Sequence, residues 1–109
     1  MIRAEYAGEE APETVARRTT VEFSEEGYRV RFSGQIVDEG TFEINPAPAK
    51  NLVLVGTAGT NEGRTIRSIY QLVGDRLRIC YGMDGLQPLD FTTRRGQKRY
   101  LATYRRASP

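Results

Sequence analysis

The sequence predicts an all-β fold, an antiparallel meander of eight strands that closes into a barrel, with one short helix after the first strand. Three observations lead to this prediction. Hydrophobic and polar residues alternate with a period of two along most of the chain, as in half-buried antiparallel strands. Turns that contain glycine separate these runs at short spacing. The length of 109 residues suits one domain, predicted over residues 1–109.

A helix is predicted only in the short stretch from Ala11 to Arg18. Pro12 suits the first turn of a helix, because an amide hydrogen would have no partner there. Glu13 lies near the positive end of the helix dipole, and Arg17 and Arg18 lie near its negative end.

The predicted strands are separated by recognisable turns. Gly74–Asp75 predicts a tight hairpin turn, and Gly40 inside a longer run predicts a bulge or a sharp bend. Asn45–Pro48 predicts a connector, because neither of its prolines fits a central strand. The predicted strands are Ile2–Tyr6, Thr19–Ser24, Tyr28–Phe32, Ile36–Ile44, Asn51–Val55, Thr65–Val73, Arg76–Tyr81 and Lys98–Arg105.

One of these strands, Asn51–Val55, is apolar on both faces. Its outer face therefore needs a cover beyond the main core, which the short helix or a second copy of the chain would provide. A homodimer through Leu52–Val55 is one interpretation, and Ile69, predicted to point outward, also favours it.

The inward face of the predicted barrel is rich in aromatic residues, and most of them are tyrosines that need hydrogen-bond partners when buried. A barrel of this size is just wide enough to be filled by side chains or to hold one small ligand. Phe23 and Tyr104 share this face. The candidate ligand-binding residues of the interior are Tyr28, Phe32, Phe42, Ser68, Tyr70, Tyr81 and Tyr100.

Several of these residues belong to a recognisable string. It comprises Glu5–Tyr6 with Gly8, Asp38–Phe42, Ile69–Tyr70, Gly74–Asp75, Leu77, Cys80, Pro88 and Phe91. The string resembles the uncharacterised lipocalin-like bacterial domain family that is abundant in planctomycetes, over nearly the whole chain. Gln87–Pro88 departs from the Arg–Pro pair usual in that family, and the tryptophan of its first strand is missing here. The resemblance implies a small lipocalin-like β-barrel and no particular reaction.

The composition excludes several kinds of site. The chain has no histidine, which removes His-based triads and the commonest zinc ligands. Cys80 is the only cysteine, so no intrachain disulfide forms, and it is predicted to be a small buried hydrophobe. Asp38–Glu39 is interpreted as a pair of solvated turn charges. We therefore expect a non-catalytic protein without a cofactor or a metal site.

No run approaches about 18 consecutive apolar residues, so no membrane-spanning helix is predicted. The N-terminal residues lack the layout of a signal peptide, which predicts a cytoplasmic protein. Export stays open if an upstream segment is missing from this chain.

Basic residues concentrate in the second half of the chain, where residues 55–109 hold 10 basic and 4 acidic side chains. Tyr100, Tyr104 and Phe91 lie among them, a pattern that would suit an OB-like binder of single-stranded nucleic acid. However, Tyr100 and Tyr104 lie on the inward face of their predicted strand, and the net charge of the chain is only +2. Binding of nucleic acid is therefore disfavoured. The cluster consists of Arg94, Arg95, Lys98, Arg99, Arg105 and Arg106.

These observations favour a small binding module that holds an apolar or amphipathic molecule inside the barrel. The alternative is an interaction module with a filled core, which acts through its surface or as a homodimer.

Overall fold

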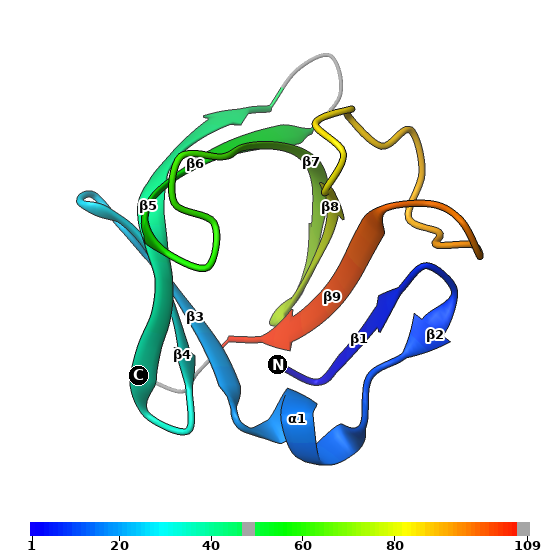
Figure 1. Ribbon diagram of the computed structural model, residues 1–109, viewed down its shortest axis with the longest axis horizontal. Coiled ribbons are helices and arrows are strands. Elements are labelled where there is room, and N and C mark those ends of the chain that lie inside the picture. The colour runs from blue at the N-terminus through cyan, green and yellow to red at the C-terminus, as the bar shows by residue number, and fades with distance from the viewer. Residues whose placement is uncertain (47–49, 107–109) are drawn as a thin grey trace.

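The computed structural model describes residues 1–46 and 50–106, and within them nine strands form one antiparallel sheet. The sheet curls round into a barrel (Figure 1). Its strand order is β2-β1-β9-β8-β7-β6-β5-β4-β3. The strands are β1 (Arg3–Tyr6), β2 (Glu9–Glu10), β3 (Thr19–Ser24), β4 (Gly27–Phe32), β5 (Gln35–Asn45), β6 (Asn51–Gly59), β7 (Thr65–Val73), β8 (Arg76–Gly82) and β9 (Arg99–Arg105). The predicted all-β meander is confirmed.

The helix α1 (Glu13–Arg17) lies in the gap between the two edges of the sheet (Figure 1). Its buried residue is Ala16, and Arg17 pairs with Glu13 at 2.8 Å across one turn. No strand ladder joins β1 to β3 within the described residues. Instead, the Met1 nitrogen donates a hydrogen bond to the Thr19 carbonyl oxygen at 2.7 Å across this gap. None of the helices in the described part of the chain is long and apolar enough to cross a membrane.

All eight predicted runs form strands, with bounds that differ by a few residues. The structure adds β2, a two-residue strand that is too short and too polar to show a period. The turn at Ala7–Gly8 creates it, because both residues have positive φ angles of 52° and 86° and reverse the chain tightly. The helix therefore follows the second strand rather than the first. The predicted connector, Asn45–Pro48, starts one residue too early, because Asn45 is the last residue of β5 and pairs with Asn51. Its residues 47 and 48 lie outside the described range.

Gly40 lies at a bulge between β5 and β6, as predicted. A Cβ atom at this position would lie 2.0 Å from the Val55 carbonyl oxygen and 2.8 Å from the Tyr28 ring. The absence of a side chain thus lets two backbones approach and lets Tyr28 pack over the strand. Tyr28 belongs to the buried core, together with Leu52, Leu54, Ile66 and Ile79.

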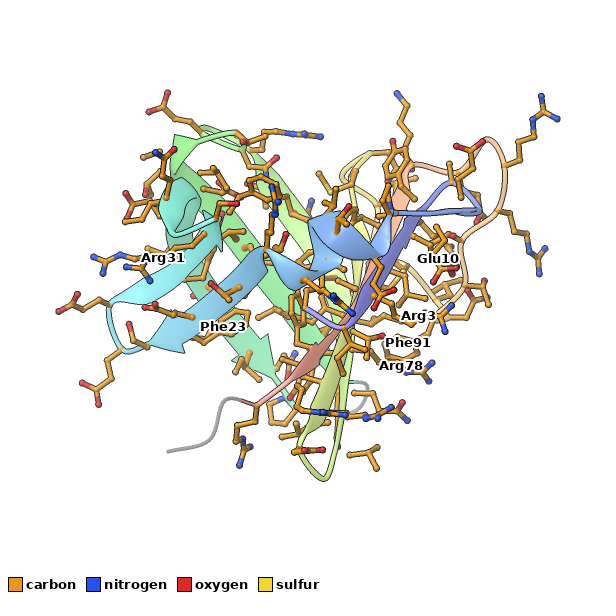
Figure 2. All side chains as sticks on the ribbon, turned by 90° about the horizontal axis from the view of Figure 1, so that it is seen from below. Arg3, Glu10, Phe23, Arg31, Arg78 and Phe91 are labelled. Carbon is orange, nitrogen blue, oxygen red and sulfur yellow. The ribbon has the colours of Figure 1, made fainter. Side chains whose placement is uncertain are left out.

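The long segment between β8 and β9 folds back over the outer face of these strands (Figure 1). Pro88 in this segment is almost fully buried, and Cys80 on the outer face of β8 is fully buried. The Arg78 guanidinium lies 4.1 Å from the centre of the Phe91 ring, and the two side chains are adjacent in Figure 2. Arg99 pairs with Asp90 at 2.9 Å. The chain therefore covers this part of its own outer face.

Ile69 is paired in register with Cys80 and is also buried, with 8% of its surface exposed. The alternation places Ile69 on the outer face of the sheet, but the residue is not exposed at the surface of the protein.

Candidate functional site

Two cavities occupy the inside of the barrel, one toward each end. The wide cavity has a volume of about 570 Å³ and reaches the Gly74–Asp75 turn and the end of β9. The narrow cavity has a volume of about 320 Å³ and reaches the loop between β6 and β7. Val21 and Tyr104 line both cavities, so the two spaces adjoin near the middle of the barrel.

The wide cavity has an apolar wall. Phe23 and Phe42 meet edge to face, with ring centres 5.1 Å apart and an interplanar angle of 79°. Apolar side chains also stand at the mouth, where Ile44 and Leu72 are 56% and 45% exposed. Further lining side chains are Leu52, Tyr70, Leu77 and Ile79. Such a wall suits an apolar molecule.

The charged side chains among the described lining residues of the wide cavity are Asp75, Arg105 and Arg106. Met1, which carries the N-terminal ammonium group, lines this cavity as well. Arg105 lies 3.9 Å from Asp75, and both side chains are more than half exposed, so this pair contributes little to stability.

The narrow cavity combines tyrosine rings with polar groups. A buried acid, Asp38, lies on its wall with 7% of its surface exposed. The Asp38 carboxylate accepts hydrogen bonds from the Asn61 side-chain amide at 2.7 Å and from the Asn61 backbone amide at 3.3 Å. Arg64 stands beside them, and its guanidinium donates to the Met83 carbonyl oxygen at 2.6 Å and to the Asn61 side chain at 3.3 Å. The tyrosines of this wall are Tyr6, Tyr28, Tyr81, Tyr100 and Tyr104.

Two buried hydroxyls have no hydrogen-bond partner among the described residues, those of Tyr28 and Ser68. Tyr28 is 3% exposed and Ser68 is fully buried. By contrast, the hydroxyls of Tyr81 and Tyr104 pair with each other at 2.9 Å. Unpartnered buried hydroxyls cost free energy, and near a cavity they are the groups that a bound molecule satisfies.

The environment of these tyrosines disfavours their ionised forms. Burial, and then the nearby Asp38 carboxylate, raise the pKa of Tyr28 to about 12. Burial also raises the pKa of Tyr81 and of Tyr104 well above the ordinary value. The phenols therefore stay neutral near pH 7 and act as hydrogen-bond donors and acceptors.

The structure distributes the predicted interior residues among several places. Phe42 and Tyr70 line the wide cavity, whereas Tyr28, Tyr81 and Tyr100 line the narrow one. Ser68 points inward but is packed among its neighbours rather than lining either cavity.

Phe32 is placed differently from the other predicted interior residues. It is 36% exposed at the end of β4 and lines neither cavity. The strand ends there because Ser33 and Gly34, with φ angles of 51° and 83°, turn the chain at the rim.

Sequence reasoning missed Asp38, Asn61 and Arg64. Asp38 is buried, so its interpretation as a solvated turn charge is wrong. The sequence did contain a sign that Asp38 is buried. Asp38, Gly40 and Phe42 are alternate residues of one strand, so Asp38 lies on the same inward face as the other two. Nothing in the alternation indicates Asn61 or Arg64, since both lie beyond the end of β6 and reach the cavity through the turn.

The strand predicted to form a homodimer turns much of its apolar surface inward. Leu52 and Leu54 are each 3% exposed and face the barrel core. The apolar residues of its outer face are Val53 and Val55. The homodimer stays a prediction, and the apolar surface that it would use is limited to Val53 and Val55 instead of the whole of Leu52–Val55.

The basic cluster and the tyrosines near it in the sequence lie in different places. Tyr100 and Tyr104 line the interior, as their parity predicts, whereas Arg94 and Arg95 are exposed on the long segment before β9. Binding of nucleic acid, which the sequence already disfavours, stays a prediction.

Among the described residues, no three Cys, Asp or Glu side chains gather closely enough to hold a metal ion. A comparison with protein-family models, curated proteins and solved structures found no match. The resemblance to a lipocalin-like family therefore stays a prediction, and the barrel interior itself is the basis for any functional assignment.

Proposed function

We propose that the barrel interior binds a small apolar or amphipathic molecule and that the protein has a non-catalytic role. The observation that carries this proposal is the wide cavity of about 570 Å³, which is open at its mouth and lined mostly by aromatic and aliphatic side chains. Binding pockets for small molecules fall in the range of about 300–1,000 Å³ and are mostly apolar with a few polar groups. A core filled by its own side chains has few voids larger than a water molecule.

The residues proposed to contact the apolar part of this molecule are Phe23, Phe42, Tyr70, Leu77 and Ile79. The tyrosines and Asp38 of the adjoining narrow cavity would meet a polar group. An amphipathic molecule would therefore find both kinds of surface within one barrel.

Native mass spectrometry tests this proposal. The protein is incubated with a mixed lipid and metabolite extract and transferred gently into the gas phase. We expect a reproducible added mass on the wild-type protein, and that mass narrows the ligand class. A bare protein before and after incubation would contradict the proposal and favour a filled-core module.

A pair of neighbouring variants locates the binding. Leu72 lines the mouth of the wide cavity and is 45% exposed, so Leu72→Trp is expected to plug the mouth without disturbing the core. Val73 is 65% exposed and does not line the cavity, which makes Val73→Trp the matched control. The added mass should be lost in the first variant and kept in the second.

A further inference from the structure

We propose that the narrow cavity recognises the ammonium group of a small organic amine, with Asp38 as its counter-ion and Tyr28 as a hydrogen-bond acceptor. This inference rests on the proposed function, because both take the barrel interior as binding space. It adds the chemical class of the ligand and assigns the polar end of the molecule to the narrow cavity.

The first argument is the buried charge of Asp38. Its carboxylate is 7% exposed and accepts hydrogen bonds from Asn61, but no lysine or arginine of the described residues lies within 4.0 Å of it. A carboxylate removed from water without a cation is costly, and a positive group brought beside it recovers part of this cost. The wall of the cavity thus favours a ligand that carries a positive charge.

The second argument is the hydroxyl of Tyr28, which is buried without a partner on the same wall. Tyr28 pairs with Gly40, and Val30 pairs with Asp38, on the neighbouring strands β4 and β5. Tyr28 and Asp38 therefore lie close together on the wall of the same cavity and belong to one polar spot. A phenol oxygen accepts a hydrogen bond from an N–H donor. A protonated primary amine carries three such donors, which can serve the carboxylate and the phenol together.

The third argument is the aromatic wall. Tyr81 and Tyr100, with ring centres 5.7 Å apart, line the same cavity as Asp38 and Tyr28, and so does Tyr6. The faces of aromatic rings attract cations. A carboxylate set among tyrosine rings is therefore the combination that recognises an organic ammonium rather than a bare anion.

Arg64 is the basic residue on this wall, and its positive charge opposes the binding of an ammonium group. The contacts of Arg64 limit this repulsion. The guanidinium is exposed at the rim, where it donates to the Met83 carbonyl oxygen and to the Asn61 side chain. It is thus engaged with protein acceptors, and solvent screens its charge. A ligand with a carboxylate head would need Arg64, so such a ligand is the competing outcome of the test.

The test compares three probes of equal chain length, octylamine, octanol and octanoate, by calorimetric titration at pH 7. We expect octylamine to bind at least about tenfold tighter than octanol, as one charge-assisted hydrogen bond provides. Octanoate should bind most weakly. If octanol binds and octylamine binds no tighter, the ammonium site is wrong and the proposed function stands. Tightest binding of octanoate also overturns the ammonium site, and no binding of any probe overturns both proposals.

Variants assign the effect to the two residues. Tyr28→Phe and Asp38→Asn should each remove most of the preference for octylamine over octanol. Asp75→Asn, at the rim of the wide cavity, is the matched control and should keep the preference. Tyr28→Phe removes an unpartnered group and should fold normally, so it decides the question even if Asp38→Asn fails to fold. An unchanged preference in Tyr28→Phe would exclude the role assigned to that hydroxyl.

Discussion

The hydroxyl oxygens of Tyr81 and Tyr104 lie 2.9 Å apart inside the barrel, on the neighbouring strands β8 and β9. Tyr104 lines both cavities and Tyr81 lines the narrow one, so this hydrogen bond stands where the two spaces adjoin. Each hydroxyl supplies the partner that the other requires away from water. The pair thus has a structural role and also divides the interior into an apolar and a polar part.

A double-mutant cycle on this pair should show strong coupling. Tyr104→Phe leaves the Tyr81 hydroxyl buried without its partner, which should lower the free energy of unfolding by about 1–3 kcal/mol. Tyr81→Phe should have a similar effect. The double variant should lose clearly less than the sum of the two single losses, because no orphaned hydroxyl remains. Urea unfolding followed by circular dichroism measures all four proteins, and additive losses would show that the hydroxyls do not depend on each other.

Tyr28→Phe should behave in the opposite way. The Tyr28 hydroxyl is buried and has no partner in the described part of the chain, so its removal deletes a desolvation cost rather than an interaction. We expect the free energy of unfolding to rise by about 1 kcal/mol. Tyr81→Phe, which removes a partnered hydroxyl, is the control in the same unfolding experiment. A loss of stability in Tyr28→Phe would mean that a bound water satisfies this hydroxyl.

The tyrosines also predict how stability depends on pH. The pKa of Tyr28 is raised from 10.0 to about 12 by burial and by Asp38. Burial raises the pKa values of Tyr81 and Tyr104 in the same direction. A folded-state pKa above the unfolded value means that the stabilisation is complete below about pH 10 and is lost as the pH rises. Each tyrosine that ionises on unfolding lowers the stability by about 1.4 kcal/mol per pH unit in this window.

Alkaline titration measures this loss. Tyrosinate absorbance and circular dichroism should change together between pH 10 and about 12, since the buried phenols ionise as the barrel opens. Removing two of the raised groups in Tyr81→Phe/Tyr104→Phe should make the decline less steep. Independent ionisation of all tyrosines near pH 10, without loss of the fold, would contradict this prediction.

The alternation of residues was sufficient to predict eight of the nine strands, because each of these eight has one face toward the barrel core, whereas β2 consists of two exposed residues. It placed Tyr28, Phe42 and Tyr70 inside, and Gly40 at a bulge, as the structure has them. The alternation predicted that Ile69 lies on the surface, and this was wrong. A residue that points outward can still be covered by a distant part of the chain. The covering segment between β8 and β9 has no periodicity of its own, so its contacts are tertiary and could not be predicted from the pattern.

The candidate site was only partly predictable for the same reason. Its tyrosines belong to strands and follow the alternation. Asn61 and Arg64 belong to a turn, and only the fold shows that this turn reaches the Asp38 carboxylate. The polarity of the narrow cavity therefore emerges from a strand residue and a turn that pairing brings together.

Gly40→Ala should test how much the close approach of β5 and β6 at the bulge requires a glycine. A Cβ atom at residue 40 would lie 2.0 Å from the Val55 carbonyl oxygen, and backbone atoms cannot move aside cheaply. We expect a loss of about 3 kcal/mol in the free energy of unfolding, at the upper end of the usual cost of overpacking. Gly63→Ala is the control, because Gly63 has a positive φ of 80° but open space around it, and it should lose only about 1 kcal/mol. Equal losses would mean that the backbone shifts at residue 40 and that the close approach to Val55 contributes little.

The reactivity of Cys80 should report how firmly the segment between β8 and β9 covers the outer face. Cys80 is fully buried, and burial raises the pKa of its thiol, so both access and thiolate formation are suppressed. We expect almost no reaction with an aromatic disulfide reagent in native buffer and complete reaction in denaturant. Phe91→Ala removes the ring beneath the Arg78 guanidinium and should speed the native reaction at least tenfold by loosening the segment. Leu89→Ala, on the same segment but 88% exposed, should react as slowly as the wild type. Fast labelling of the wild-type protein would show that the cover opens readily, and equal rates in both variants would place the closing contact elsewhere than at Phe91.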